Sequence, residues 1–335
     1  MHKKRILSGI QPTAAEPHFG NYFGAIQNWV SLQTDYDCVF AVVNYHAMTM
    51  PYNPPNLRQN TWDLIFNLIA VGVKPQNLCI QSLIPEHTEL GWILNCFCSY
   101  GELSRMTQFK EKSEQGQTTD KESFVSAGLF DYPVLQAADI LLYKADFVPV
   151  GKDQTQHLEL SRHIADRFNR SVGQDYFILP QILFTDTPKI NSTAEPAKKM
   201  SKSLGDKHFI SIFEDAKVLD KKIRSAMTEA GGQPTEEIGA GLLNLLTLLK
   251  AAGQTAACDY YTEAIKAGKL VNGELKNQTS LALQQLTAQF SSQRAEILAH
   301  QEHYKTQIRD ASATIRLRAQ NTLKEVKELA GLLNY

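Results

Sequence analysis

The stretch Cys38-Val-Phe-Ala-Val-Val43 decides the fold. An uninterrupted apolar run rich in β-branched and aromatic residues is typical of a parallel strand that is covered on both faces. Further strands are predicted over residues 5–10 and 77–82, and residues 21–33 and 57–71 between them have helical spacing. Strand, helix, strand, helix, strand at this spacing predicts an α/β fold built on a doubly wound parallel sheet.

The rest of the chain divides into two parts. Residues 102–142 are mainly helical in pattern, residues 145–150 predict another strand, and residues 155–168 predict a helix after it. The composition changes after Ser203, and from residue 209 onward the pattern is almost entirely helical. We therefore predict a Rossmann-like domain over residues 1–204 and an α-helical domain over residues 205–335.

Length and charge limit the classes of function. With 335 residues, 43% hydrophobic, the chain can bury a full core, and its net charge of -1 excludes a generally basic nucleic-acid coat. No signal peptide and no apolar run of about 18 residues is found, so we expect a cytoplasmic protein without a membrane span. The five cysteines form no CxxC pair, which favours reduced, mostly buried thiols. Cys96 and Cys98 lie in an apolar context and are predicted to pack in the core, so no protein-bound metal is expected.

The most specific motif is Lys199-Met200-Ser201-Lys202-Ser203. By chance this pentapeptide should occur in about one chain in 10,000 of this length. It matches the KMSKS loop of class I aminoacyl-tRNA synthetases at every position. Two lysines and two hydroxyls on a loop can close over a triphosphate and match the charge that moves onto pyrophosphate as the α-phosphorus is attacked.

A second, weaker motif follows the first predicted strand. The turn Gln11-Pro12-Thr13 is followed by His18-Phe19-Gly20-Asn21, which resembles the HIGH motif of the same class. Glycine at a helix start lets an adenine ring lie against the backbone, while the helix amino end and the imidazole favour phosphates. No Walker A or GxGxxG pattern occurs, which disfavours a P-loop ATPase or a nicotinamide enzyme.

These motifs and several longer segments make the chain similar to bacterial tryptophanyl-tRNA synthetases over nearly its full length. The segments that carry the resemblance are Ser8-Gly9-Ile10-Gln11-Pro12, Arg105-Met106-Thr107-Gln108-Phe109-Lys110, Ala137-Ala138-Asp139-Ile140-Leu141-Leu142-Tyr143, Val148-Pro149-Val150-Gly151, Asp153-Gln154 and His157-Leu158-Glu159-Leu160. Tyrosyl enzymes share the architecture but not the Met106 and Ala137 segments. The resemblance implies a nucleotidylyl-transferase of the HIGH/KMSKS type, acting on ATP, L-tryptophan and tRNA(Trp), with Mg²⁺ carried in on ATP.

The resemblance also implies roles for single residues. Asp139 would accept the indole N–H, with Tyr132, Gln11, Gln136 and His46 around the amino acid. Lys199, Lys202, His18 and Gln11 would be catalytic. The residues that would line ATP are Gln11, Pro12, Thr13, Gly20, Asn21, Gly151, Lys152, Asp153, Ile190, Lys199, Met200, Ser201, Lys202, Ser203 and Lys112.

Several positions depart from the pattern of the family. Asn44-Tyr45 stands where the family has Asp-Gln, Gln136 where it has methionine, and Lys152 where it has glutamate. Gln136 is the most consequential, because a polar amide on the wall of an indole slot needs a hydrogen-bond partner. Tyrosine activation and a non-catalytic tRNA-binding paralogue therefore stay open as alternatives, although the intact Lys199 loop argues against the second.

The tRNA surface and the dimer interface are harder to predict. The family is homodimeric, and the candidates for the interface are Ile93-Leu94-Phe97 and Met106-Phe109, which core burial explains equally well. The candidates for basic, tRNA-contacting faces are Lys217, Lys221, Lys222, Arg224, Arg316, Arg318, Lys324 and Lys327, although helix charges are more often simply solvated.

Overall fold

The computed structural model describes residues 3–13, 16–109, 125–149, 151, 154–183, 187–229, 237–269 and 272–334. Within these residues five parallel strands form one sheet in the order β3-β2-β1-β4-β5. The strands are β1 (Arg5–Ile10), β2 (Asp37–Val42), β3 (Leu78–Ile80), β4 (Phe147–Pro149) and β5 (Gln181–Leu183). The predicted doubly wound sheet is therefore confirmed. The predicted strand over residues 77–82 is shorter, because its last part forms the 3-10 turn η3 (Gln81–Leu83).

Strand β2 shows why the sheet needs cover on both faces. Cys38, Phe40 and Val42 pack into one hydrophobic cluster, while Val39 and Ala41 pack into another. Side chains alternate across a strand, so each face of β2 contributes to its own layer of core.

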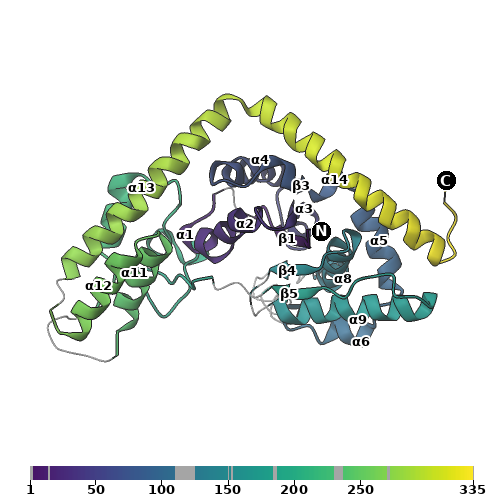
Figure 1. The fold of residues 1–335 in the computed structure, drawn as a ribbon, viewed down its shortest axis with the longest axis horizontal. Helices are drawn as coiled ribbons and strands as arrows, with labels where there is room; N and C mark the ends of the chain where they lie inside the picture. Colours follow the sequence, from purple (N-terminus) through teal and green to yellow (C-terminus); the bar gives the residue numbers. More distant parts are fainter. Residues whose placement is uncertain are drawn as a thin grey trace.

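Helices enclose the sheet (Figure 1). Those of the amino-terminal part are α1 (Phe19–Asn21), α2 (Gln27–Leu32), α3 (Asn44–Ala47), α4 (Pro54–Ala70), α5 (Glu86–Asn95), α6 (Tyr100–Ser104), α8 (Ala127–Leu142) and α9 (Thr155–Val172), with the 3-10 turn η2 (Pro75–Asn77). After the 3-10 turns η5 (Lys202–Leu204) and η6 (Asp206–His208) come α10 (Ala216–Arg224), α11 (Ala240–Ala251), α12 (Thr255–Lys266), α13 (Asn272–Ala299) and α14 (Gln301–Leu329).

The predicted helix over residues 21–33 is not regular. A π-helical turn, η1 (Tyr22–Ile26), separates α1 from α2. Tyr22 and Phe23 pack toward the carboxyl-terminal helices, and Trp29 stacks on Phe40 of β2 with ring centroids 4.5 Å apart. The wide turn therefore lets one short segment bury side chains in two directions, and π-turns of this kind are frequent at functional sites.

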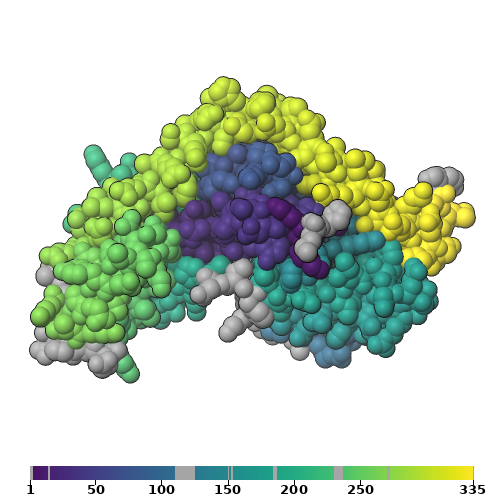
Figure 2. Space-filling view, viewed as in Figure 1, coloured from purple at the N-terminus to yellow at the C-terminus, as the bar shows by residue number. Residues whose placement is uncertain are grey.

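The two longest helices form an arch over the molecule (Figures 1 and 2). Helix α13 packs on α4, α10 and α11, and α14 then descends over β3, α5 and α8. The basic residues of α14 help to dock it: Arg316 pairs with Glu86, Arg318 with Asp37, and Lys327 with Glu89.

The candidate tRNA-contacting faces stay a prediction, but five of their eight basic residues form ion pairs within the chain. Besides those three residues of α14, Lys222 pairs with Asp206 and Glu214, and Arg224 pairs with Asp220. Of the predicted set, Lys217, Lys221 and Lys324 form no ion pair with the acidic groups of the described chain.

Some burial expectations need correction as well. Cys38, Cys79 and Cys258 are buried, but Cys96 is exposed and Cys98 is only partly buried, because they follow the end of α5 at the surface. Ile93, Leu94 and Met106 are buried within the chain itself. The large exposed side chains beside them are Trp92 and Tyr100, at 75% and 78% exposed. No helix among the described residues is long and apolar enough to cross a membrane.

Candidate active site

A cavity of about 410 Å³ opens at the carboxyl ends of β1, β2 and β4. Strands β1 and β4 are neighbours although they are not consecutive in the chain, so the direction of winding reverses there, where ligands of doubly wound sheets bind. The lining residues from the strand ends and the helices above them include Gly9, Gln11, Gly24, Ala25, Val43, His46, Gln108, Tyr132, Gln136, Asp139, Val148, Gly151, Gln154 and Lys199.

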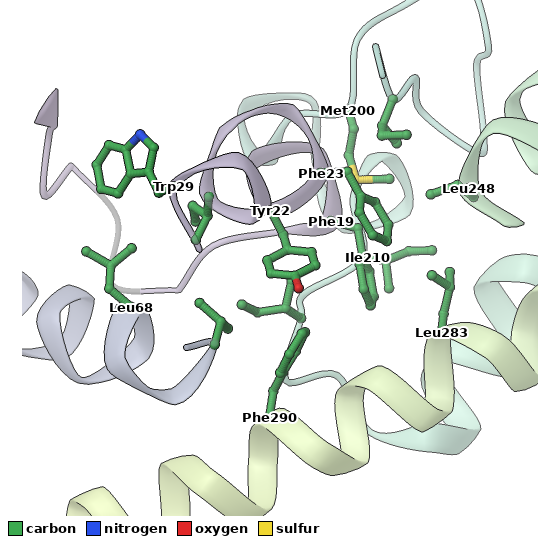
Figure 3. Packing of buried hydrophobic residues seen from close by; sticks show 14 of the residues in the cluster. Phe19, Tyr22, Phe23, Trp29, Leu68, Met200, Ile210, Leu248, Leu283 and Phe290 are labelled. Carbon is green, nitrogen blue, oxygen red and sulfur yellow. The ribbon is translucent and has the colours of Figure 1, made fainter. Parts of the chain in front are cut away.

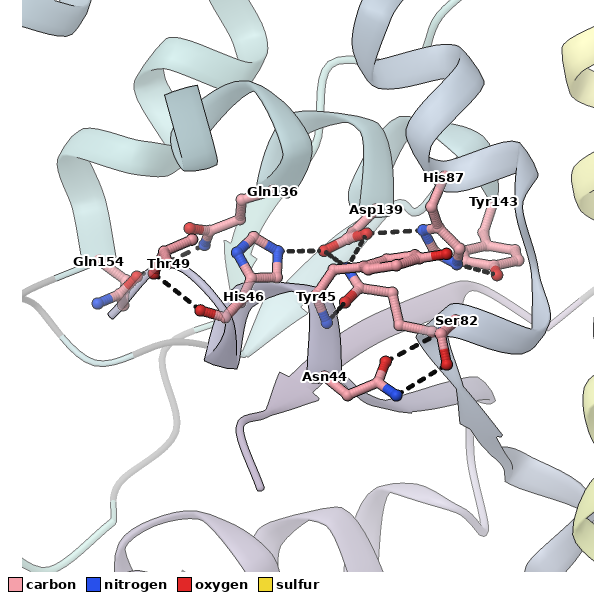
Figure 4. A network of polar contacts seen from close by, with 11 residues as sticks. Asn44, Tyr45, His46, Thr49, Ser82, His87, Gln136, Asp139, Tyr143 and Gln154 are labelled. Carbon is pink, nitrogen blue, oxygen red and sulfur yellow. Dashed lines mark hydrogen bonds and ion pairs between the residues drawn. The ribbon is translucent and has the colours of Figure 1, made fainter. Parts of the chain in front are cut away.

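Asp139 is the buried acceptor at the inner end of this cavity (Figure 4). His46 Nε2 donates to its Oδ2 at 2.8 Å, and Gln81 Nε2 donates to Oδ1 and Oδ2 at 2.8 and 3.0 Å. His87 Nδ1 lies 2.6 Å from Oδ1, but outside the angles of a hydrogen bond. On its other side His87 Nε2 lies 2.8 Å from the hydroxyl of Tyr143.

This surrounding decides the charge of Asp139. Burial raises the pKa of its carboxyl group, but the neighbouring His87 and His46 outweigh that effect and hold the pKa well below its usual range. Because a carboxylate can only accept, the proton of His46 lies on Nε2. The cavity therefore ends in an anion that is already held in place.

The amide and hydroxyl groups along the cavity are also oriented. The hydroxyl of Tyr132 lies 2.8 Å from His157 Nε2 and donates to Gln108 Oε1 at 3.2 Å. Gln136 Nε2 makes only a long contact of 3.5 Å with Gln154 Oε1. The amide of Gln136 is thus weakly held, whereas the Tyr132 hydroxyl is fixed between two partners.

His18 caps the turn that follows β1. Its Nδ1 accepts the backbone N–H of Asn21, and the Asn21 side chain accepts the backbone N–H of His18. An Nδ1 that accepts leaves the ring proton on Nε2. Burial, together with the charges of Lys202 and Lys199, lowers the pKa of His18 to about 4, so that the ring is neutral at neutral pH.

Met200 of the Lys199 to Ser203 loop packs beside Phe23 and Phe19, which directly follows His18 (Figure 3). A side chain at Gly20 would come within 2.9 Å of the His18 ring and 3.2 Å of Met200 Cβ, which explains glycine at this position. Met200 is buried in the same cluster as Phe19, Phe23 and Leu248. The loop is thereby anchored between η1 and the carboxyl-terminal helices.

The two lysines of the loop occupy different positions. Lys199 lines the cavity. Lys202 begins η5, its Nζ lies 5.4 Å from the ring centroid of Phe209, and burial lowers its pKa although Glu16 and Glu214 act in the opposite direction. Ser201 and Ser203 hydrogen-bond each other at 2.8 Å. The arrangement offers two cations and a neutral imidazole donor around one mouth of the cavity.

Comparison with known proteins agrees with this geometry. Residues 1–288 match the family described as tRNA synthetases class I (W and Y). The chain belongs to this family. It is 38% identical to a tryptophan–tRNA ligase 2 of Streptomyces avermitilis, over 99% of this chain and 98% of that protein. It is 40% identical to the tryptophan–tRNA ligase of Wolinella succinogenes, over 99% of this chain and all of that protein.

The synthetase is also similar in structure to solved tryptophanyl-tRNA synthetases. The tryptophanyl-tRNA synthetase of Mycoplasma pneumoniae superposes with a TM-score of 0.84 at 33% identity, over 99% of this chain and 98% of that one. The Campylobacter jejuni enzyme complexed with ADP and tryptophan has a TM-score of 0.81 at 32% identity, over 98% of this chain and 100% of that one. The resemblance inferred from the motifs is confirmed.

The structure brings part of the predicted site together. Within the cavity of this synthetase lie Gln11, His46, Tyr132, Gln136, Asp139, Gly151 and Lys199. The predicted site residues that are described but do not line the cavity are Pro12, Thr13, His18, Gly20, Asn21, Ile190, Met200, Ser201, Lys202 and Ser203. Ile190 and Met200 are buried in the core, and the side chain of Asn21 takes part in the cap. Lys112, Lys152 and Asp153 fall outside the described residues.

Sequence reasoning missed the residues that hold Asp139 and Tyr132. Gln81 directly follows β3, so the rule that ligands lie beyond strand ends was a signal for it. His87 and His157 are fully buried on helices, where no pattern distinguishes a positioning histidine from an ordinary core residue.

Proposed function

We propose that this synthetase is a tryptophan–tRNA ligase. The carboxylate of L-tryptophan attacks the α-phosphorus of ATP, pyrophosphate leaves, and the tryptophanyl group then passes from AMP to the terminal adenosine of tRNA(Trp). The observation that carries the assignment is the ionised Asp139 in a cavity whose lining combines apolar residues, such as Val43, Ile140 and Val148, with amide and hydroxyl groups. Such an acceptor favours an aromatic side chain that carries an N–H group, as indole does.

The amino-acid end of the site follows from the contacts of each group. Asp139 accepts the indole N–H, His46 and Gln136 flank the ring, and the oriented hydroxyl of Tyr132 binds the ammonium group together with Gln11. Phenylalanine would leave Asp139 without this partner, at a cost of about 1–3 kcal/mol or more for a charged acceptor. The pocket would therefore discriminate without a separate editing site.

At the nucleotide end, protein side chains balance the negative charge of the phosphates, and the reaction needs no nucleophilic side chain. His18 Nε2–H, Lys199 and Lys202 stabilise the phosphates as negative charge moves onto pyrophosphate, while the remaining predicted ATP residues position the base and ribose. Among the described residues no group of three or more His, Cys, Asp and Glu side chains is arranged to hold a metal ion. Mg²⁺ would enter with ATP as part of the substrate.

Pyrophosphate–ATP exchange, measured with each of the twenty amino acids offered singly and without tRNA, tests the proposal. We expect exchange with tryptophan alone. Exchange with tyrosine instead would assign the pocket to a phenol, and no exchange with any amino acid would favour a non-catalytic tRNA-binding protein. Asp139→Ala should weaken discrimination against phenylalanine, and unchanged discrimination would contradict its role.

The loop lysine has a matched control. Lys202→Ala should slow the activation step with little change in tryptophan binding, since Lys202 acts on the phosphates. Lys207→Ala removes an exposed lysine a few residues further along and should leave activation unchanged. Equal rates for the two variants would remove the assignment of Lys202.

The larger organisation of the synthetase is also a proposal. We assign residues 1–204 to catalysis and residues 205–335 to tRNA contact, in a cytoplasmic homodimer. Trp92 on α5 and Tyr100 on α6 expose large apolar side chains, which is suited to a subunit interface. Trp92→Glu should convert the dimer to a monomer in light scattering, and a monomeric native protein would contradict the assignment.

A further inference from the structure

A second cavity lies between α4 and α14, away from the candidate active site. Its volume is about 420 Å³, within the range of small-molecule sites. It is lined by Asn44, Tyr52, Pro54, Leu57, Arg58, Thr61, Trp62, Ile80, Ser82, Leu83 and Arg309. None of these residues lines the active-site cavity, so the two spaces are distinct.

The charged side chains of this lining have one sign. Arg58 and Arg309 are the only ionised groups among its described lining residues, and both side chains are exposed. Neither forms an ion pair with a carboxylate of the described chain, whereas nearby Lys305 is paired with Glu302 at 2.7 Å. Glu302 lies near enough to Arg309 for the guanidinium to help lower the pKa of that carboxyl group, but no ion pair forms between them. Two guanidinium groups that are not bound to a carboxylate, one from α4 and one from α14, favour an anionic ligand held by charge-assisted hydrogen bonds.

The wall between them is aromatic. Trp62 is half-buried, and Phe66 lies behind it at a centroid distance of 6.1 Å with nearly parallel rings. The guanidinium carbon of Arg309 lies 5.7 Å from the ring centroid of Trp62. Tyr52 and Leu83, both 42% exposed, add apolar surface at the rim. A flat ring can therefore stack beside Trp62 while its anionic group reaches the arginines.

The floor of the cavity is joined to the amino-acid pocket (Figure 4). Asn44 Nδ2 donates to Ser82 Oγ at 2.8 Å, and the backbone N–H of Ser82 donates to Asn44 Oδ1 at 3.1 Å. The next pair along both segments is Tyr45 with Gln81, whose side-chain oxygen accepts the Tyr45 N–H at 3.0 Å. Gln81 in turn donates to both oxygens of Asp139.

We propose that the cavity lined by Trp62, Arg58 and Arg309 is a second ligand site that takes a flat aromatic carboxylate, and that its occupancy alters the amino-acid pocket through the Asn44–Ser82 hydrogen bonds. Asn44, which lines this cavity, is uncharged, so it does not repel a carboxylate. The effect on the amino-acid pocket rests on the proposed function, whereas binding of the carboxylate at the second site does not.

Binding of naphthalene-2-carboxylate to the full chain tests the site, with naphthalene-2-carboxamide as the uncharged comparison. L-tryptophan and a non-hydrolysable ATP analogue are kept saturating to block the active site. We expect the carboxylate to bind at least about tenfold more tightly than the amide, which corresponds to about 1.4 kcal/mol. The double variant Arg58→Gln/Arg309→Gln should lose this preference, and Trp62→Leu should weaken both compounds.

Exposed Arg162 on α9 provides the control, since Arg162→Gln removes one positive charge far from the cavity and should leave binding unchanged. All four substituted side chains are exposed or half-buried, and thermal midpoints check that the variants are folded. Equal affinity for the carboxylate and the amide, or binding that survives in the double variant, would overturn the site.

The link to the active site has its own measurement. Naphthalene-2-carboxylate should change the KM for tryptophan in pyrophosphate exchange, and Asn44→Ala should abolish this change while binding persists. A constant KM at saturating carboxylate would overturn the link and leave the site itself intact. Absence of exchange in the unmodified protein would instead contradict the proposed function, so the two failures are distinguishable.

Discussion

His18 shows how a single hydrogen bond can fix the chemistry of a residue. Its Nδ1 accepts the Asn21 N–H, so the neutral ring presents Nε2–H as a donor. Protonation of His18 would place a buried charge beside Lys202 and Lys199, so burial first and the two lysines second lower its pKa to about 4. The site is thus supplied with a donor that does not titrate near neutral pH.

The same pKa predicts a loss of stability in mild acid. Between about pH 6.5 and pH 4 the unfolded chain takes up a proton at this histidine and the folded chain does not, so the free energy of unfolding falls as the pH is lowered through this window. His18→Asn should lose less stability than the native protein between pH 7 and pH 5 in urea titrations. The exposed His303→Asn is the control, and identical losses in all three proteins would refute the prediction.

Gln136 gives a prediction about substrate affinity. Its amide lies on the cavity wall and has only the 3.5 Å contact with Gln154. An indole ring that covers this amide would remove it from water without providing a hydrogen bond in return, which costs binding free energy. Gln136→Met should lower the KM for tryptophan about three- to tenfold with kcat unchanged, corresponding to about 1 kcal/mol. A higher KM in the variant would mean that the amide binds the substrate.

At the scale of the element, Glu102 joins two helices. It forms the capping box of α6 with Ser99, and it binds both terminal nitrogens of Arg167 on α9 at 2.6 and 2.8 Å. The Arg167 guanidinium, helped by His163, lowers the pKa of Glu102 to about 2. One carboxylate therefore fixes both the start of α6 and its contact with α9.

Removing this carboxylate should have a measurable effect. Glu102→Gln should cost about 1–2 kcal/mol at pH 7, and the difference from the native protein should shrink as the pH falls from about 4.5 toward 2, because the native carboxylate is then protonated too. Glu302→Gln changes a fully exposed carboxylate and is the matched control in denaturant titrations. A pH-independent difference would contradict the electrostatic cause.

The elements also show where sequence reasoning ends. Apolar composition was sufficient for the strands, because a strand buried on both faces admits few other residues. The π-turn η1 escaped prediction, since Phe23, Ile26 and Trp29 have spacing that fits an α-helix and the wider turn is imposed by partners such as Phe290, far along the chain. For the same reason Asp139 was found from its segment, but its partners Gln81 and His87, more than 50 residues away, were not.

At the scale of the whole molecule, α14 ties the carboxyl-terminal helices back to the sheet. Its inward stripe of Ile315, Ala319, Leu323 and Val326 is buried in the cluster that also contains α8 and α9 residues. Helical periodicity predicted the helix but not its destination, because the acidic partners Asp37, Glu86 and Glu89 lie in the amino-terminal third of the chain. The division at residue 204 therefore remains a proposal about function.

Two positions on α14 test this docking. Ile315→Ala removes a buried side chain and should lower the free energy of unfolding by about 2–4 kcal/mol, in line with other large-to-small core substitutions. Leu317→Ala, two residues further on, removes a side chain that is 60% exposed and should change it by less than about 0.5 kcal/mol. Similar losses at both positions in urea titrations would show that α14 is not packed as described.

The π-turn between α1 and α2 carries a consequence for how this chain can evolve. The turn contains one residue more than an α-helical path would need, and it lies between Tyr22, which contacts Phe290, and Trp29, which stacks on Phe40. Deleting Gly24 would convert the π-turn into an ordinary α-helical turn and leave Trp29 close to its present direction. Deleting a residue from the regular helix α2 before Trp29 would instead rotate the following side chains by about 100° and take Trp29 away from Phe40. The length of this segment can therefore change by one residue at the π-turn, whereas the same change inside α2 would cost the contact between Trp29 and the sheet.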